Sequence, residues 1–199
     1  MFNNLVTYYI HKQAALPANN ALAYQYILAG NGVFIRAETS FFDVVLPIVP
    51  CPVRGLAPLT QRFQLKVPRI PVKLLRTVFA DARRARRSDS GLNEVLYQFH
   101  YHGQTVQVQK PAQKTTAVST STTEGDDKRI LCELHSHGNM RAFFSPTDNG
   151  DEQGAKVYAV MGKLDSGPEM RLRVGVYGYW YPLPVTAVFT DNGPFKDCH

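Results

Sequence analysis

The sequence predicts an α/β fold, in which a few helices flank a mixed, partly antiparallel sheet and a small β-rich extension precedes it. Residues 1–66 contain short β-rich runs separated by turn signals, one amphipathic helical run follows, and strand patterns alternate with turns after that. The 199 residues are 44% hydrophobic and 19% charged, which is typical of a folded chain and excludes collagen-like, coiled-coil and disordered classes. We therefore expect an extension over residues 1–66 and a main domain over residues 67–199.

The strands of the extension are predicted from turn residues. Residues 24–28 and 33–37 flank Gly30-Asn31-Gly32, a strong hairpin signal. A β-rich run over residues 42–49 ends where several prolines occur, and proline has no backbone N–H to donate to a neighbouring strand. Residues 55–58 are expected to connect this part to the next.

A helix is predicted to begin at Pro71, whose missing N–H costs nothing in a first turn. The apolar residues that follow have helical spacing: Val72, Leu74, Leu75, Val78, Phe79 and Ala82. Basic residues supply the polar side and the last turn, namely Lys73, Arg76, Arg83 and Arg84. We expect this helix to end at residues 88–91.

Alternating patterns predict the strands of the main domain. Residues 95–101 and 105–109 form a hairpin around His102-Gly103, and residues 112–127, rich in Thr and Ser, form a mobile loop. Further strands are expected at 130–135, 156–161 and 170–180. Between them, Ser145 is predicted to cap a short helix that begins at Pro146.

Composition also limits the cell compartment and the partners. Three widely spaced cysteines favour reduced thiols in a cytoplasmic protein. We expect no signal peptide, and no apolar run is long enough to predict a membrane span. The net charge of +6, with a basic run at residues 83–87, favours an acidic partner or nucleic acid. No aromatic residues interrupt that run, so a solvated helix face is the favoured interpretation and nucleic-acid binding is not expected.

Two histidines carry the main chemical signal. If the strand over 130–135 continues to His137, His135 and His137 project to the same side, because strand side chains repeat every two residues. Asp148 follows where a loop can return a helix N-terminus to the strand end. Two imidazole nitrogens and one carboxylate suit Zn²⁺, with a fourth position open for water. A second pair, His100 and His102, has no acid at a fitting distance and is expected to be structural.

A hydrolytic zinc site also needs a general base. Glu94 is the preferred candidate because it precedes an apolar strand that would place its carboxylate beside a buried sheet. Glu38 and Glu133 are the alternatives. Glu133 shares the face of His135 but lies further into the strand, where an unpaired charge is costly.

These residues resemble the JAMM motif (also called MPN+ or JAB) of zinc metallopeptidases, which has a glutamate, then His-x-His, ten residues and Asp, with Ser three before the Asp. His135-Ser136-His137 and Ser145-Pro146-Thr147-Asp148 match it position by position, and the resemblance covers residues 67–179. There are two departures. Gly138 stands where many members have Pro, and Val-Leu-Tyr-Gln follows Glu94 where Val-x-Gly is commoner.

The resemblance implies a JAB/MPN-like fold of cytidine-deaminase-like architecture and a set of roles. His135, His137 and Asp148 would bind zinc, Glu94 would activate the water, and Ser145 would stabilise the oxyanion. The reaction would be hydrolysis of a peptide or isopeptide bond, at the C-terminal tail of a ubiquitin-like or other small protein held as an extended strand.

A narrower resemblance rests on Arg-Ala-Phe-Phe-Ser-Pro-Thr-Asp and Tyr-Gln-Phe-His. Both segments are similar to the PRTRC system protein A family, which is encoded in bacterial cassettes beside ThiF-like (E1-like) and ParB-like proteins. This implies a bacterial or plasmid-borne source and a ThiF-like partner. Two alternatives stay open, a non-catalytic interaction module of the same fold and a plasmid maintenance factor that binds nucleic acid through the basic helix.

Overall fold

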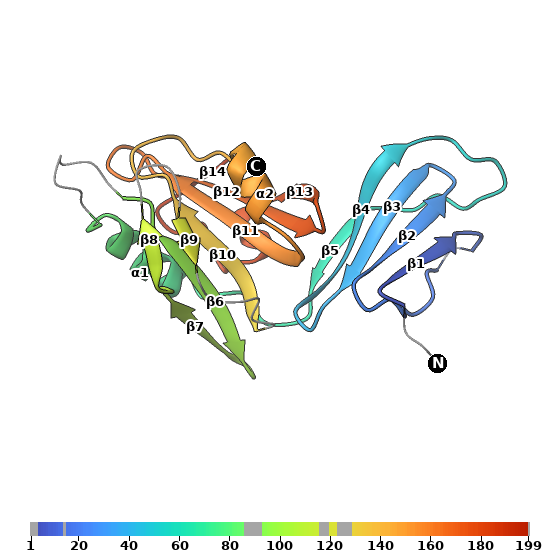
Figure 1. Ribbon diagram of the computed structural model, residues 1–199, viewed down its shortest axis with the longest axis horizontal. Helices are drawn as coiled ribbons and strands as arrows, with labels where there is room; N and C mark the ends of the chain where they lie inside the picture. The colour runs from blue at the N-terminus through green and yellow to red at the C-terminus, as the bar shows by residue number, and fades with distance from the viewer. Residues whose placement is uncertain (1–3, 14, 86–92, 116–119, 123–128, 199) are drawn as a thin grey trace. The chain divides into compact units, whose positions relative to one another are not determined.

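The computed structural model describes residues 4–13, 15–85, 93–115, 120–122 and 129–198 (Figure 1). The chain divides into two compact units. The first, here called the N-terminal unit, contains residues 1–67 with the short segments 153–155 and 175–181, and the second, the main unit, contains the rest.

The N-terminal unit is built on a five-stranded sheet in the order β1-β2-β3-β4-β5. Its strands are β1 (Val6–Ile10), β2 (Tyr24–Ala29), β3 (Gly32–Glu38), β4 (Phe42–Pro50) and β5 (Arg62–Leu65). The first two pair in parallel and the others antiparallel. The hairpin predicted around Gly30-Asn31-Gly32 is confirmed as β2 and β3, and Gly32 has a φ of 152° that other residues rarely adopt.

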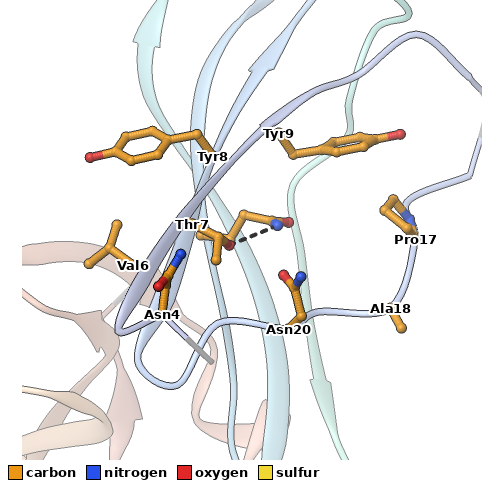
Figure 2. A pocket seen from close by; sticks show the side chains of 9 residues that line it. Asn4, Val6, Thr7, Tyr8, Tyr9, Pro17, Ala18 and Asn20 are labelled. Carbon is orange, nitrogen blue, oxygen red and sulfur yellow. Dashed lines mark hydrogen bonds between the residues drawn. The ribbon is translucent and has the colours of Figure 1, made fainter. Parts of the chain in front are cut away.

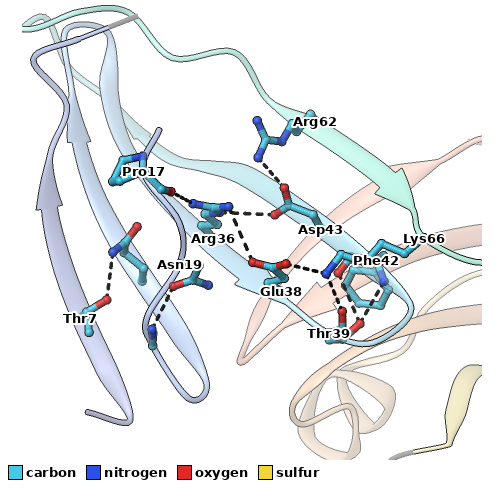
Figure 3. Close-up of polar contacts among 12 residues, drawn as sticks. Thr7, Pro17, Asn19, Arg36, Glu38, Thr39, Phe42, Asp43, Arg62 and Lys66 are labelled. Carbon is cyan, nitrogen blue, oxygen red and sulfur yellow. Dashed lines mark hydrogen bonds and ion pairs between the residues drawn. The ribbon is translucent and has the colours of Figure 1, made fainter. Parts of the chain in front are cut away.

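One face of this sheet holds a small apolar core and a charged network. Ile27, Phe34 and Val45 are buried together on three neighbouring strands. Further along the same sheet, the buried Arg36 forms ion pairs with Asp43 (3.4 Å) and Glu38 (3.8 Å), as Figure 3 shows. Because Arg62 and Lys66 supply further positive charge, the carboxylates of this network are all paired.

Apart from residues 155, 175–176 and 179–181, which are counted with the N-terminal unit, the main unit contains a seven-stranded sheet in the order β13-β12-β11-β10-β6-β7, with β14 paired to β12. Its strands are β6 (Leu96–His102), β7 (Thr105–Gln109), β10 (Ile130–Ser136), β11 (Ala155–Gly162), β12 (Glu169–Val176), β13 (Tyr179–Leu183) and β14 (Lys196–Asp197). β10 pairs antiparallel with β6 and parallel with β11, so the sheet is mixed. The predicted hairpin around His102-Gly103 is confirmed as β6 and β7.

Two α-helices and one 3₁₀ turn are described in the main unit: α1 (Val72–Ala82), α2 (Pro146–Asp151) and η1 (Val185–Ala187). Leu75, Val78 and Ala82 form the buried side of α1. The helix begins at Val72, one residue later than predicted, because Pro71 is its extended N-cap. It ends at Ala82, so the predicted basic last turn is wrong, and Arg83 and Arg84 lie beyond the helix. The predicted end at residues 88–91 falls outside the described residues.

Two strand predictions need correction. The single strand expected at 170–180 is two strands, β12 and β13, because Tyr177 (φ 47°) and Gly178 (φ 89°) form a turn between them. The loop expected at 112–127 contains a two-stranded pair, β8 (Gln113–Thr115) with β9 (Thr120–Thr122), and residues 116–119 and 123–127 lie outside the described residues.

Mixed sheets with few helices fit the predicted α/β class. In the part of the chain that the structure describes, no helix has the length and apolar character required to span a bilayer.

Candidate metal centre

The two histidines of the His-x-His motif lie at the end of β10. His135 is in the strand, and His137 follows it and donates its backbone N–H to the Met161 carbonyl of β11. The extended backbone therefore continues past the strand, and the two imidazoles fall on one side. Their Nε2 atoms are 3.1 Å apart.

A capping box at the start of α2 positions the carboxylate. The Ser145 hydroxyl accepts from the Asp148 backbone N–H (3.2 Å), and Asp148 Oδ2 accepts from the Ser145 backbone N–H (2.5 Å). This leaves Oδ1 of Asp148 free to face the histidines, at 3.4 Å from His135 Nε2. The predicted N-cap and first helical residue are confirmed.

The three donor atoms fit a zinc ion. One ligand atom each from His135, His137 and Asp148 lie within 4.8 Å of one another, and no other such group of three is found among the described residues. Tetrahedral zinc ligands at about 2.0–2.1 Å from the metal are about 3.3 Å apart. The distances of 3.1 and 3.4 Å match that spacing. Two imidazole nitrogens with one carboxylate oxygen are a donor set that suits zinc.

The strand register brings Glu94 to the same place. In the antiparallel pair of β6 and β10, Leu96 is opposite His135. Continuing this register by two residues sets Glu94 opposite His137, and Glu94 Oε1 is 3.9 Å from His137 Nε2. Glu94 is buried, with 5% of its surface exposed.

Ser136, which lies between the two histidines, holds Glu94 in position. Its side chain points away from the imidazoles, accepts from the Val95 N–H (3.1 Å) and donates to the Asn93 carbonyl (3.5 Å), while its backbone N–H donates to the Val95 carbonyl. Both neighbours of Glu94 are thus fixed to the strand that carries the histidines. Sequence reasoning missed this role, although a small hydroxyl residue at the centre of His-x-His was a signal.

Burial controls the protonation of the site. Burial lowers the pKa of His135 to about 4 and also lowers the pKa of His137. In both cases the negative charge of Asp148 acts in the opposite direction and raises the pKa. Both imidazoles are therefore neutral near pH 7, which is the form that binds metals. Burial, reinforced by the Asp148 charge, raises the pKa of Glu94 to about 7.

A family comparison agrees with this geometry. A family model for prokaryotic homologues of the JAB domain matches residues 77–175. The chain belongs to the JAB family. The matched segment of the JAB domain includes Glu94, both histidines, Ser145 and Asp148. A search of curated proteins found no match to this chain. The predicted family is thus confirmed, and the closer resemblance to PRTRC system protein A stays a prediction.

Arg173 of the JAB domain clamps both ends of α2. From β12, its Nε donates to Oε2 of Glu152, the C-cap of α2 (2.7 Å), and its Nη2 forms an ion pair with the same oxygen (2.5 Å). The same group lies 3.7 Å over the ring of Phe144, which precedes Ser145. A six-residue helix is not stable alone, so these contacts keep α2, and with it Asp148, in place. No local sequence pattern predicts this contact.

Close packing fixes the segment that follows His137. A Cβ at Gly162, the last residue of β11, would overlap the backbone of Met140, Arg141 and Ala142. Phe143 in this segment is 42% exposed and contacts the His137 ring edge-on (4.6 Å between centroids). Phe144, the next residue, packs instead against the Arg173 guanidinium.

The alternative site residues have other partners. Glu133 accepts from Gln98 (3.1 Å) and pairs with Lys156 (3.6 Å), and Glu38 pairs with Lys66 (2.6 Å) in the N-terminal unit. Cys132 is fully buried, on the opposite side of β10 from His135. In the basic run, Arg83 pairs with Asp165 (3.4 Å), and residues 86 and 87 lie outside the described residues.

Proposed function

We propose that the JAB domain of this chain is a zinc-dependent hydrolase that cleaves a peptide or isopeptide bond. The convergence of His135 Nε2, His137 Nε2 and Asp148 Oδ1, with the Glu94 carboxylate beside them, carries the proposal. His135, His137 and Asp148 would hold the metal. When bound, zinc would lower the pKa of a water toward about 7 and polarise the carbonyl of the scissile bond.

The protein groups supply the proton transfers. Glu94 Oε1 takes a proton from the attacking water as its oxygen bonds to the carbonyl carbon, and it delivers that proton to the leaving nitrogen as the C–N bond breaks. Because Ser136 fixes the backbone on both sides of Glu94, the carboxylate keeps its orientation during this exchange. Water is consumed, and the products are a carboxylate and an amine.

The role assigned to Ser145 in this proposal is to stabilise the developing oxyanion. Its hydroxyl oxygen accepts from the Asp148 backbone, so the hydroxyl hydrogen is available to donate to a substrate carbonyl oxygen. The substrate proposed is the C-terminal tail of a ubiquitin-like or other small protein, and a ThiF-like protein is the proposed partner.

The proposal is tested with zinc-loaded protein and ubiquitin that carries a C-terminal aminomethylcoumarin amide, with unfolded casein as a second substrate. We expect cleavage by the wild type that 1,10-phenanthroline stops and added zinc restores. Glu94→Gln should bind zinc as the wild type does and lose activity about 100- to 10,000-fold. Zinc-loaded wild type that leaves both substrates intact would favour the non-catalytic interaction module.

A further inference from the structure

A groove in the N-terminal unit runs beside β1. It has a volume of about 490 Å³. One wall is β1, including Thr7 and Tyr9, and the other is the segment that contains Pro17, Ala18 and Asn20 (Figure 2). Among the described residues, none that lines it is charged. Arg36 donates to the Pro17 carbonyl (2.7 Å), so the second wall is tied to the sheet and the groove is preformed (Figure 3).

A buried acceptor in this groove has no partner. Gln25 of β2 is 4% exposed and lines the groove, and its Nε2 donates to Thr7 Oγ1 (3.0 Å). Its Oε1 atom is buried without a hydrogen bond in the described structure. A buried carbonyl oxygen is costly unless it accepts a hydrogen bond, so this site favours a ligand that brings an N–H or O–H donor.

The outer edge of β1 offers a regular row of backbone groups. In the parallel pairing with β2, the Leu5 carbonyl accepts from Tyr24 N–H and the His11 N–H donates to the Leu28 carbonyl. The odd-numbered residues therefore bond toward β2, and the backbone groups of the even-numbered residues, Val6, Tyr8 and Ile10, face away. β1 is the terminal strand of its sheet in the described part of the chain.

This edge lacks the devices that normally prevent strand pairing. β1 contains no charged residue and no proline, and it pairs with β2 without a bulge. Tyr8 and Ile10 are 78% and 52% exposed. An exposed apolar edge beside an uncharged groove is suited to the addition of another strand.

We propose that this groove binds an extended, uncharged polypeptide segment, which adds to β1 as a sixth strand and donates a hydrogen bond to Gln25 Oε1. The spacing of the free backbone groups along β1 favours a polypeptide, because its own N–H and C=O groups repeat with the same period. The five residues of β1 match a segment of about five residues. This binding needs no metal and is independent of the proposed hydrolysis.

The test selects ligands from a phage-displayed library of random 12-residue peptides against the full chain. We expect enriched peptides with an uncharged extended core. By amide exchange measured with NMR, a bound peptide should slow exchange at Val6, Tyr8 and Ile10 at least 10-fold and leave Thr7 and Tyr9, already bonded to β2, nearly unchanged.

Two variants separate strand addition from contact with the tyrosine ring. Tyr8→Pro removes an outward N–H that β2 does not use, so the sheet should persist and peptide binding should fall at least 10-fold. Tyr8→Ala keeps that N–H and should bind within a few-fold of the wild type. Gln25→Leu, which removes the buried acceptor, should also weaken peptide binding at least 10-fold. If Tyr8→Pro does not fold, this second variant tests whether the peptide binds in the groove.

Three results would overturn the proposal. They are the absence of enriched peptides, protection at sites away from β1, and variants Tyr8→Pro and Gln25→Leu that bind like the wild type. Protection of the three β1 amides that rises with protein concentration when no peptide is present would show instead that a second copy of the chain occupies this edge.

Discussion

The chain contains two His-x-His pairs on adjacent strands, and only one lies in a metal-binding arrangement. At the end of β10, His135 and His137 bring their Nε2 atoms within 3.1 Å, beside Asp148 and Glu94. On β6, the rings of His100 and His102 are nearly parallel with centroids 6.5 Å apart, and His100 contacts Gln98. The spacing in sequence is the same in both pairs.

The surroundings of the two pairs explain the difference. Because β6 and β10 are antiparallel, with Ile130 opposite His100 and Leu96 opposite His135, the pairs lie at opposite ends of the two strands. Only the end with His135 and His137 receives the N-terminus of α2 and Glu94, which lies two residues before β6. A His-x-His motif therefore provides two donors on one side, and the chain around it decides whether a third ligand and a base arrive.

The largest expected effect separates the two pairs directly. His137→Ala should weaken zinc binding by more than about 100-fold, beyond what loss of an indirect contact to a ligand produces. The matched variant His102→Ala should bind zinc like the wild type. Zinc titration of the metal-free proteins with a competing chromophoric chelator measures both. Equal losses in the two variants would remove the distinction between the pairs.

The buried base gives the next prediction, in the free energy of unfolding of the metal-free protein. Burial raises the folded-state pKa of Glu94 from 4.5 to about 7, so the folded state holds this proton more tightly than the unfolded state. The wild type therefore loses stability as the pH rises from 4.5 to 7. Glu94→Gln, which cannot ionise, should be more stable than the wild type by about 2–3 kcal/mol at pH 8 and nearly equal at pH 4.

Urea unfolding across this pH range measures the effect. Glu133→Gln is the control, because Glu133 is paired with Lys156 and its substitution should not stabilise the protein at high pH. A Glu94→Gln variant that is less stable than the wild type at pH 8 would contradict the account of this carboxylate.

The contacts of Arg173 with Glu152 and Phe144, at the two ends of α2, should have a smaller effect on metal binding. Arg173→Met removes the ion pair with Glu152 and the contact with Phe144, so α2 would hold Asp148 less firmly. We expect zinc affinity to fall about 10- to 100-fold, with Arg173→Lys intermediate because it keeps the charge without the planar group. Unchanged affinity in Arg173→Met, measured by the same titration, would show that the clamp only stabilises the fold.

The smallest effect is expected from the packing beside His137. Gly162→Ala should lower the free energy of unfolding by about 1–3 kcal/mol, because the new methyl group overlaps the backbone of residues 140–142. Gly150→Ala in α2 is the matched control. Its Cβ meets nothing within 4 Å, so it should be neutral or stabilising. If urea unfolding finds the two variants equally stable, this segment is not closely packed against β11.

Local patterns predicted the elements that depend on local chemistry. The hairpin at Gly30-Asn31-Gly32 and the cap at Ser145 both follow from residues a few positions apart. The turn at Tyr177-Gly178 was missed because tyrosine has a high strand propensity and rarely adopts a positive φ, so the apolar pattern there is continuous.

The candidate site was predictable in part. Sequence spacing placed the two histidines and Asp148 together, and their geometry is compatible with that expectation, while their roles stay predictions. The position of Glu94 depends on the register of two strands whose facing residues are about forty positions apart, and the Arg173 contacts join β12 to both ends of α2. Such long-range contacts leave no periodic pattern in the sequence.

The X-ray absorption spectrum of the zinc-loaded protein tests the central claim most directly. We expect one zinc per chain with two imidazole nitrogens and oxygen donors at about 2.0–2.1 Å, and loss of one imidazole contribution in His137→Ala. A sulfur ligand at about 2.3 Å, or a shell of oxygen atoms without imidazole, would contradict the assignment of this centre.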